Sequence, residues 1–117
     1  MAFNNTVLSQ LLKMLPRHGF EKLANAQDGR RRSDALSRWS QFVALTVGHL
    51  GGRTSLRDIE ATLHTQPRQR YHLGSQNVSR SALGRANEQL GYEFYESLFA
   101  TLYERCTCPA PRHGFRF

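Results

Sequence analysis

The chain has 117 residues, enough for one compact unit with a single hydrophobic core. Its net charge of +7, from 16 basic and 9 acidic residues, favours a polyanionic partner. No stretch approaches the roughly 20 apolar residues of a membrane helix, and the start lacks a basic signal-peptide region, so neither secretion nor membrane insertion is expected. Only Lys13 and Lys22 are lysines; the arginine excess suits phosphate and guanine contacts, although genomic base composition would give the same bias.

Residues 1–52 are expected to form the amino-terminal helical part of a single domain. Apolar residues recur at spacings of three and four over 3–15, which predicts an amphipathic first helix that stops at Pro16. A shorter second helix is expected over 20–26. The basic run at 30–32 that follows is either a solvated loop or a phosphate contact.

A third helix is predicted between Ser37, a good N-cap, and the pair Gly51 and Gly52, because glycine supplies the left-handed residue that ends many helices. The positions expected to face inward are Trp39, Phe42, Val43, Val47 and Leu50. Trp39 is expected to pack in the core and not to stack on nucleic-acid bases. This helix is therefore the predicted centre of the core.

Residues 53–105 are predicted to hold a helix-turn-helix-like pair and a long last helix. An S-x-x-D capping pattern that begins at Ser55 predicts a helix over about 54–65. The segment 66–78 contains a proline and a glycine, so it is expected to break the helix before Ser79 restarts it. This connection is longer than the three or four residues of a usual helix-turn-helix.

The helix that follows Ser79 is the predicted recognition helix. A helical wheel places an apolar stripe inward, formed by Leu83, Ala86 and Leu90. The outward face is small, polar and basic: Ser81, Gly84, Arg85 and Glu88, with Arg80 and Asn87 on its flanks. Small residues let a helix backbone approach a major groove closely, and arginine can reach guanine edges or phosphates.

After an interruption at Gly91, an acidic and aromatic last helix is expected to continue to about Arg105. Its apolar period comprises Tyr95, Leu98, Phe99 and Leu102. Residues 106–117 are expected to form an irregular linker. No segment alternates with a period of two for long enough to predict a sheet, so the chain is expected to be all-α, with about five to six helices.

The positive charge is concentrated in the predicted helical pair. Residues 53–85 contain six arginines and two acids, whereas the charged residues of 86–104 are all acidic. The residues expected to contact bases or the groove are Arg80, Ser81 and Arg85, with Gln76 and Asn77 approaching at the turn. Those expected to contact phosphates are Arg53, Arg57, Arg68 and Arg70. Double-stranded DNA is thus the expected partner.

Two strings in this region, TSLRDIEATL at 54–63 and YHLGSQNVSRSALGRANE at 71–88, resemble the amino-terminal domain of bacterial DDE transposases of the insertion-sequence-four type. The opening, FNNTVLSQLLKMLPRHGFEKL, is similar to that family's start, so the resemblance covers nearly the whole chain. The chain departs at Ala82, where the family usually has threonine, a change expected to weaken a cap or a phosphate contact. The resemblance implies a bacterial, cytoplasmic, nucleoid-associated protein that binds the terminal inverted repeats of a transposon.

The closing HGFRF at 113–117 is similar to the family's linker toward its first catalytic strand. The resemblance therefore implies a truncated frame or an excised domain without the DDE nuclease, and hence no enzyme activity. Two-metal phosphoryl transfer needs several carboxylates that converge on the metal ions. Asp58 and Glu60 lie two residues apart on a predicted helix, so their side chains are expected to point in different directions. The histidines and the pair Cys106 and Cys108 lack zinc-site spacing, so no metal, cofactor or small-molecule substrate is expected.

Two functions remain open at this point. The first is a DNA-binding domain that positions transposon ends for a catalytic domain. The second is an interaction module that forms a transposase homodimer through the last helix, with incidental DNA contact. That helix and its start carry aromatic residues on more than one face: Tyr92, Phe94, Tyr95, Phe99 and Tyr103. The two roles are compatible.

Overall fold

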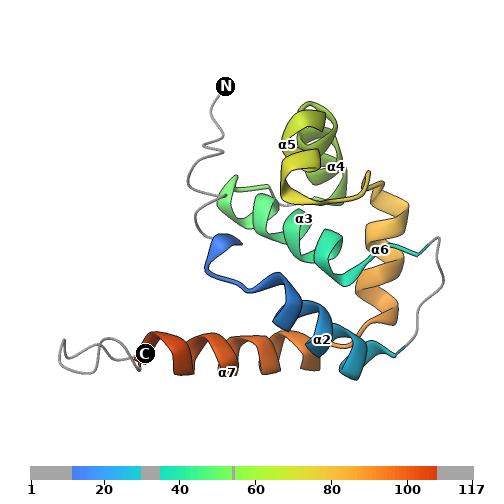
Figure 1. Ribbon diagram of the computed structural model, residues 1–117. Helices are drawn as coiled ribbons and strands as arrows, with labels where there is room; N and C mark the ends of the chain where they lie inside the picture. Colours follow the sequence, from blue (N-terminus) through green and yellow to red (C-terminus); the bar gives the residue numbers. More distant parts are fainter. Residues whose placement is uncertain (1–11, 30–34, 54, 108–117) are drawn as a thin grey trace.

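Helices make up most of the chain in the computed structural model, which describes residues 12–29, 35–53 and 55–107 (Figure 1). The six helices in these ranges are α2 (Arg17–Asp28), α3 (Arg38–Leu50), α4 (Leu56–His64), α5 (Pro67–Leu73), α6 (Arg80–Gln89) and α7 (Glu93–Thr107). The described residues contain no strand, so the predicted all-α class is confirmed.

Helix α3 lies at the centre of the arrangement. It packs against α2 and against α4; α4 also contacts α5 and α6, and α2 contacts α7. Figure 1 shows α2 alongside α7, with α4 and α5 gathered at the other side of α3. The chain therefore has an α2–α7 layer and a group of α4, α5 and α6, with α3 between them.

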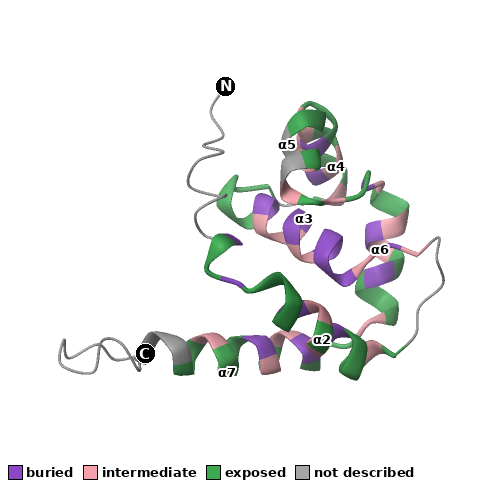
Figure 2. Ribbon diagram, in the orientation of Figure 1, coloured by how far each residue is buried: buried purple, intermediate pink, exposed green. Residues whose placement is uncertain are grey.

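One apolar core joins these helices, and it is rich in aromatic rings. The ring centroid of Phe20 lies 4.9 Å from those of both Trp39 and Phe94, in edge-on contacts. Trp39 is 4% exposed and its indole N–H donates to the carbonyl oxygen of Leu73 at 2.8 Å, which confirms the predicted packing role. Figure 2 shows the buried residues on the inner faces of the helices.

Serine hydroxyls begin three of the helices. Each accepts a backbone N–H three residues ahead at 3.1 Å: Ser37 from Ser40, Ser55 from Asp58 and Ser79 from Ala82. Such a cap contributes about 1 kcal/mol to stability. At the end of α3, Gly52 takes a left-handed φ of 67° and the Arg53 N–H donates to the carbonyl oxygen of Gly48 at 2.8 Å. The predicted boundaries of α3 are thus confirmed.

The segment 66–78 differs from the prediction, because it contains helix α5. Pro67 lies in the first turn of α5, where its missing N–H removes no helical hydrogen bond. Gly74 ends α5 with a left-handed φ of 73°. The expected break was wrong for 67–73, since proline and glycine mark the two ends of a short helix as readily as they mark a loop.

Periodicity also misplaced two apolar residues. Leu50 is 51% exposed and Phe99 is 63% exposed, although both were expected to belong to inward stripes. Phe94 is fully buried in place of Phe99, because α7 turns only one face toward α2. Helical spacing indicates which residues share a stripe, but it does not say which stripe a neighbouring helix covers.

Several predicted boundaries fall at or beyond the edges of the described ranges. Helix α2 begins at Arg17, earlier than the expected 20–26. The predicted first helix over 3–15 lies mostly outside the described residues, although Leu12 and Leu15 are buried core residues. The basic run at 30–32 and most of the predicted linker also lie outside them, and α7 continues to Thr107.

Candidate nucleic-acid interface

Helix α6 keeps one face in the core and turns the other to solvent. Leu83 is fully buried and Ala86 is 2% exposed, as the helical wheel predicted. On the opposite side the exposed residues are Ser81, Arg85 and Glu88, and Arg80 and Asn87 are exposed on its flanks. This face can therefore approach a ligand without unpacking the helix.

Helix α4 packs beside the first turns of α6 and fixes its start. Gly84 is half-buried, and a Cβ at this position would lie 3.6 Å from Leu56 Cδ1. The helical wheel placed Gly84 on the outward face, which was wrong because α4 covers that edge. Glu60 Oε2 accepts a hydrogen bond from the backbone N–H of Arg80 at 2.9 Å. A residue of α4 therefore satisfies one of the N–H groups that begin α6.

The carboxyl-terminal half of α6 is held by α3. Asn87 Oδ1 accepts a hydrogen bond from Gln41 Nε2 at 2.9 Å. Gln41 is 2% exposed, and its Oε1 accepts from Arg38 Nη1 at 3.1 Å. Polar contacts thus hold both ends of α6, at Glu60 and at Asn87.

A buried arginine organises the polar interior behind α6. Arg38 is 4% exposed and binds Asp28 with two hydrogen bonds, Nε to Oδ2 at 2.8 Å and Nη2 to Oδ1 at 2.6 Å. Its Nη2 also donates to the carbonyl oxygen of Gly91 at 3.1 Å, and its guanidinium lies 4.6 Å from the ring centroid of Phe94. Arg38 is therefore a structural residue. Sequence reasoning missed it, since a pair ten residues apart leaves no periodic signal.

Tyr95 completes this network from α7. Its hydroxyl donates to Gln41 Oε1 at 2.8 Å. Burial raises the pKa of Tyr95 to about 12, and the nearby Arg38 opposes part of that rise. The phenol is consequently neutral at physiological pH and serves as a hydrogen-bond donor.

The turn between α5 and α6 is tied to the start of α3 by Gln76. Its side-chain Oε1 accepts the backbone N–H of Ser37 at 2.8 Å, and its own N–H donates to the buried Ser40 Oγ at 2.9 Å. Gln76 thus positions the turn, although it was selected as a DNA contact. Asn77 beside it is exposed.

The four arginines expected on phosphates differ in their surroundings. Arg53, Arg57 and Arg68 are exposed. Arg70 is half-buried and its Nε donates to the carbonyl oxygen of Leu63 at 3.0 Å, near the end of α4. Between described residues, the ion pairs join Arg17 to Glu21 and Arg38 to Asp28, so neither uses one of these four arginines.

The aromatic residues at α7 divide between the core and the surface. Phe94 is fully buried and Tyr95 half-buried, whereas Tyr92 is 71% and Phe99 63% exposed. The ring centroids of Phe99 and Tyr103 lie 6.1 Å apart. The aromatic content predicted from sequence thus supplies both core packing and an exposed surface.

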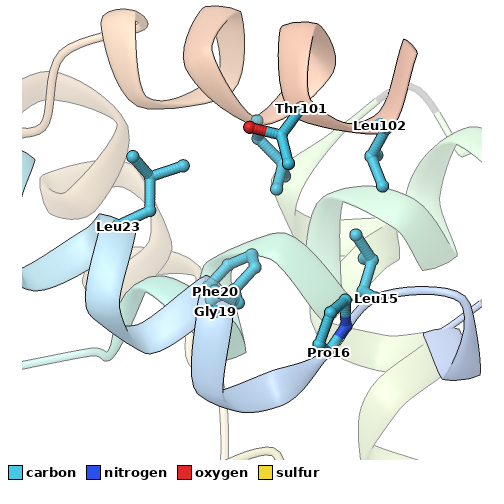
Figure 3. Close-up of a pocket in the computed structure, with 8 residues that line it drawn as sticks. Leu15, Pro16, Gly19, Phe20, Leu23, Thr101 and Leu102 are labelled. Carbon is cyan, nitrogen blue, oxygen red and sulfur yellow. The ribbon is translucent and has the colours of Figure 1, made fainter. Parts of the chain in front are cut away.

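An apolar cavity of about 120 Å³ lies between α2 and α7 (Figure 3). Leu15, Pro16, Gly19, Phe20, Leu23, Leu98, Thr101 and Leu102 line it. Because none of these side chains is a titratable acid or base, the cavity does not suit general acid–base catalysis. Within the part of the chain that the structure describes, no three His, Cys, Asp or Glu side chains gather as a metal site.

Comparison with known proteins places the chain beside one family. The family described as "Domain of unknown function (DUF4372)" matches residues 3–76, more than half of the chain. The match includes α2 to α5 and ends in the turn before α6. No curated protein and no solved structure matches. Among the described helices, none has the length and apolar character required to cross a membrane.

Proposed function

Because this chain belongs to the DUF4372 family, which is often found in transposase-like proteins, we propose that it is a transposase DNA-binding domain. It recognises the terminal inverted repeats of a transposon as double-stranded DNA. It carries no nuclease activity of its own and presents the bound ends to a DDE catalytic domain. This role places it in the bacterial cytoplasm, on the nucleoid.

The exposed face of α6 is the observation that carries the proposal. Ser81 and Arg85 lie there, opposite the buried Leu83 and Ala86. A short side chain beside an arginine lets the helix approach a major groove while the guanidinium reaches a guanine edge. The polar contacts at Glu60 and Asn87 hold the helix in place before DNA arrives, which lowers the ordering cost of binding.

Arginines outside α6 supply the phosphate contacts. Arg53 and Arg57 flank the start of α4, and Arg68 and Arg70 lie in α5. Four such contacts predict that log affinity falls with log salt with a slope of roughly −3 to −4, at about −0.9 for each phosphate. Arg70 contributes less, because its Nε already binds Leu63.

Fluorescence anisotropy with a labelled terminal-repeat duplex and a random duplex of equal length tests the proposal. A salt-independent affinity, or no binding, would contradict it. Arg85→Ala should lose discrimination between the two duplexes by about 1–3 kcal/mol, the size of one bidentate arginine–guanine contact. Arg68→Ala is the matched control, since a lost phosphate contact weakens both complexes almost equally. Equal losses in both variants would mean that α6 does not read bases.

The exposed aromatic side of α7 favours a second function, dimerisation of the transposase. Phe99 is 63% and Tyr103 39% exposed. A contiguous exposed apolar patch marks an interaction surface, and the ring centroids of these two residues lie 6.1 Å apart. Sedimentation velocity at several concentrations should show a dimer that Phe99→Ser weakens. A monomer at all concentrations would contradict this second proposal and leave the first intact.

A further inference from the structure

We propose that Glu60 is a specificity-determining residue: its carboxylate fills the anion position at the start of α6 and keeps DNA phosphates away from it. This inference rests on the proposed DNA-binding function. It deepens that function by assigning a role to an acidic side chain within the most basic part of the chain.

The first turn of α6 shows why the position is filled. The backbone N–H of Arg80 donates to Glu60 Oε2 at 2.9 Å, and the N–H of Ala82 donates to Ser79 Oγ at 3.1 Å. A helix N-terminus attracts anions through these N–H groups and its dipole. Here the carboxylate of Glu60 already accepts a hydrogen bond from the first of these N–H groups, that of Arg80.

The carboxylate is also held in place. Glu60 is half-buried on α4, next to the buried Ile59. Helix α4 packs directly against α6. The backbone that carries Glu60 is thus fixed relative to the start of α6, and the hydrogen bond from the Arg80 N–H holds the carboxylate there.

The consequence concerns the way in which α6 meets DNA. A phosphate at a helix tip can be bound at any base sequence, because phosphates carry no sequence information. Repulsion by Glu60 disfavours that contact and leaves docking through the side face, where Ser81 and Arg85 lie. Specificity is thus gained by penalising the wrong complex as well as by favouring the right one.

Glu60→Gln tests the idea, since the amide oxygen can still accept the Arg80 N–H while the charge is lost. Glu96→Gln is the matched control, because Glu96 is exposed on α7 and carries the same charge. Relative to this control, Glu60→Gln should tighten random-duplex binding about twofold to fivefold, the size of a charge effect at a helix end. Its salt slope should steepen by about 0.9, for one added phosphate, and the cognate-to-random affinity ratio should fall.

Glu60→Asp keeps the charge and should retain the wild-type slope. The proposal is overturned if Glu60→Gln behaves like Glu96→Gln, or if Glu60→Asp steepens the slope equally. If circular dichroism shows the glutamine variant unfolded, Glu60→Ala removes the same charge and the same slope comparison decides. Absence of duplex binding by the wild-type protein would refute the proposed function itself, and the inference with it, before any variant is compared.

Discussion

Truncation of Arg38 should be among the most destabilising changes in this protein. The side chains of Arg38 and Asp28 are 3% and 5% exposed, and Arg38→Ala would leave the carboxylate buried without its cation. Breaking such a pair from one side costs about 3–5 kcal/mol. The hydrogen bonds from Arg38 to Gln41 and to the carbonyl oxygen of Gly91 are lost as well. Because domains of this size have a free energy of unfolding of about 5–15 kcal/mol, much of the total stability is removed.

Urea unfolding followed by circular dichroism measures this effect for Arg38→Ala, Asp28→Ala and the double variant. The double variant should lose less than the sum of the two single losses, because no unpaired charge then remains. Glu21→Ala is the control, since its 3.3 Å pair with Arg17 is 43–46% exposed and is worth about 0–1 kcal/mol. A loss of under about 1 kcal/mol in Arg38→Ala would refute the structural role of the buried pair.

Three further outcomes are expected. The pKa of Tyr95 is about 12 in the folded protein, against an ordinary 10.0. The stability linked to this group is therefore complete below pH 10 and falls by about 2–3 kcal/mol between pH 10 and pH 12. Tyr95→Phe should lose this decline in urea titrations across the same pH range. A Cβ on Gly48 would lie 2.7 Å from Ile59 Cδ1, so Gly48→Ala should destabilise by about 1–3 kcal/mol, and a thermal melt of Gly48→Ala in an Ile59→Val background should show a smaller loss. Incubation with magnesium or manganese should leave both strands of a terminal-repeat duplex intact on a denaturing gel, and reproducible nicking would contradict the non-catalytic assignment.

The all-α class and most helix boundaries could be predicted from the sequence because their causes are local. The hydroxyls of Ser37, Ser55 and Ser79 bind N–H groups only three residues ahead, and Gly52 supplies its left-handed turn within the same few residues. The inward placement of Leu83 followed from the spacing within a single helix. Interactions of this range are fully visible in a window of four to seven residues.

The placement of the predicted contact residues depended on packing between distant segments. Glu60 meets the start of α6 twenty residues away, and Tyr95 reaches Gln41 across 54 residues. Gln76, chosen from sequence as a DNA contact at the turn, also accepts the backbone N–H of Ser37. The amino-acid sequence by itself determined the described helices other than α5, and the exposed arginine Arg85 on α6. Only the tertiary structure decided which polar side chains are buried. A hydrogen bond or buried ion pair between distant segments depends on how the helices pack, and it leaves no periodic pattern in the sequence.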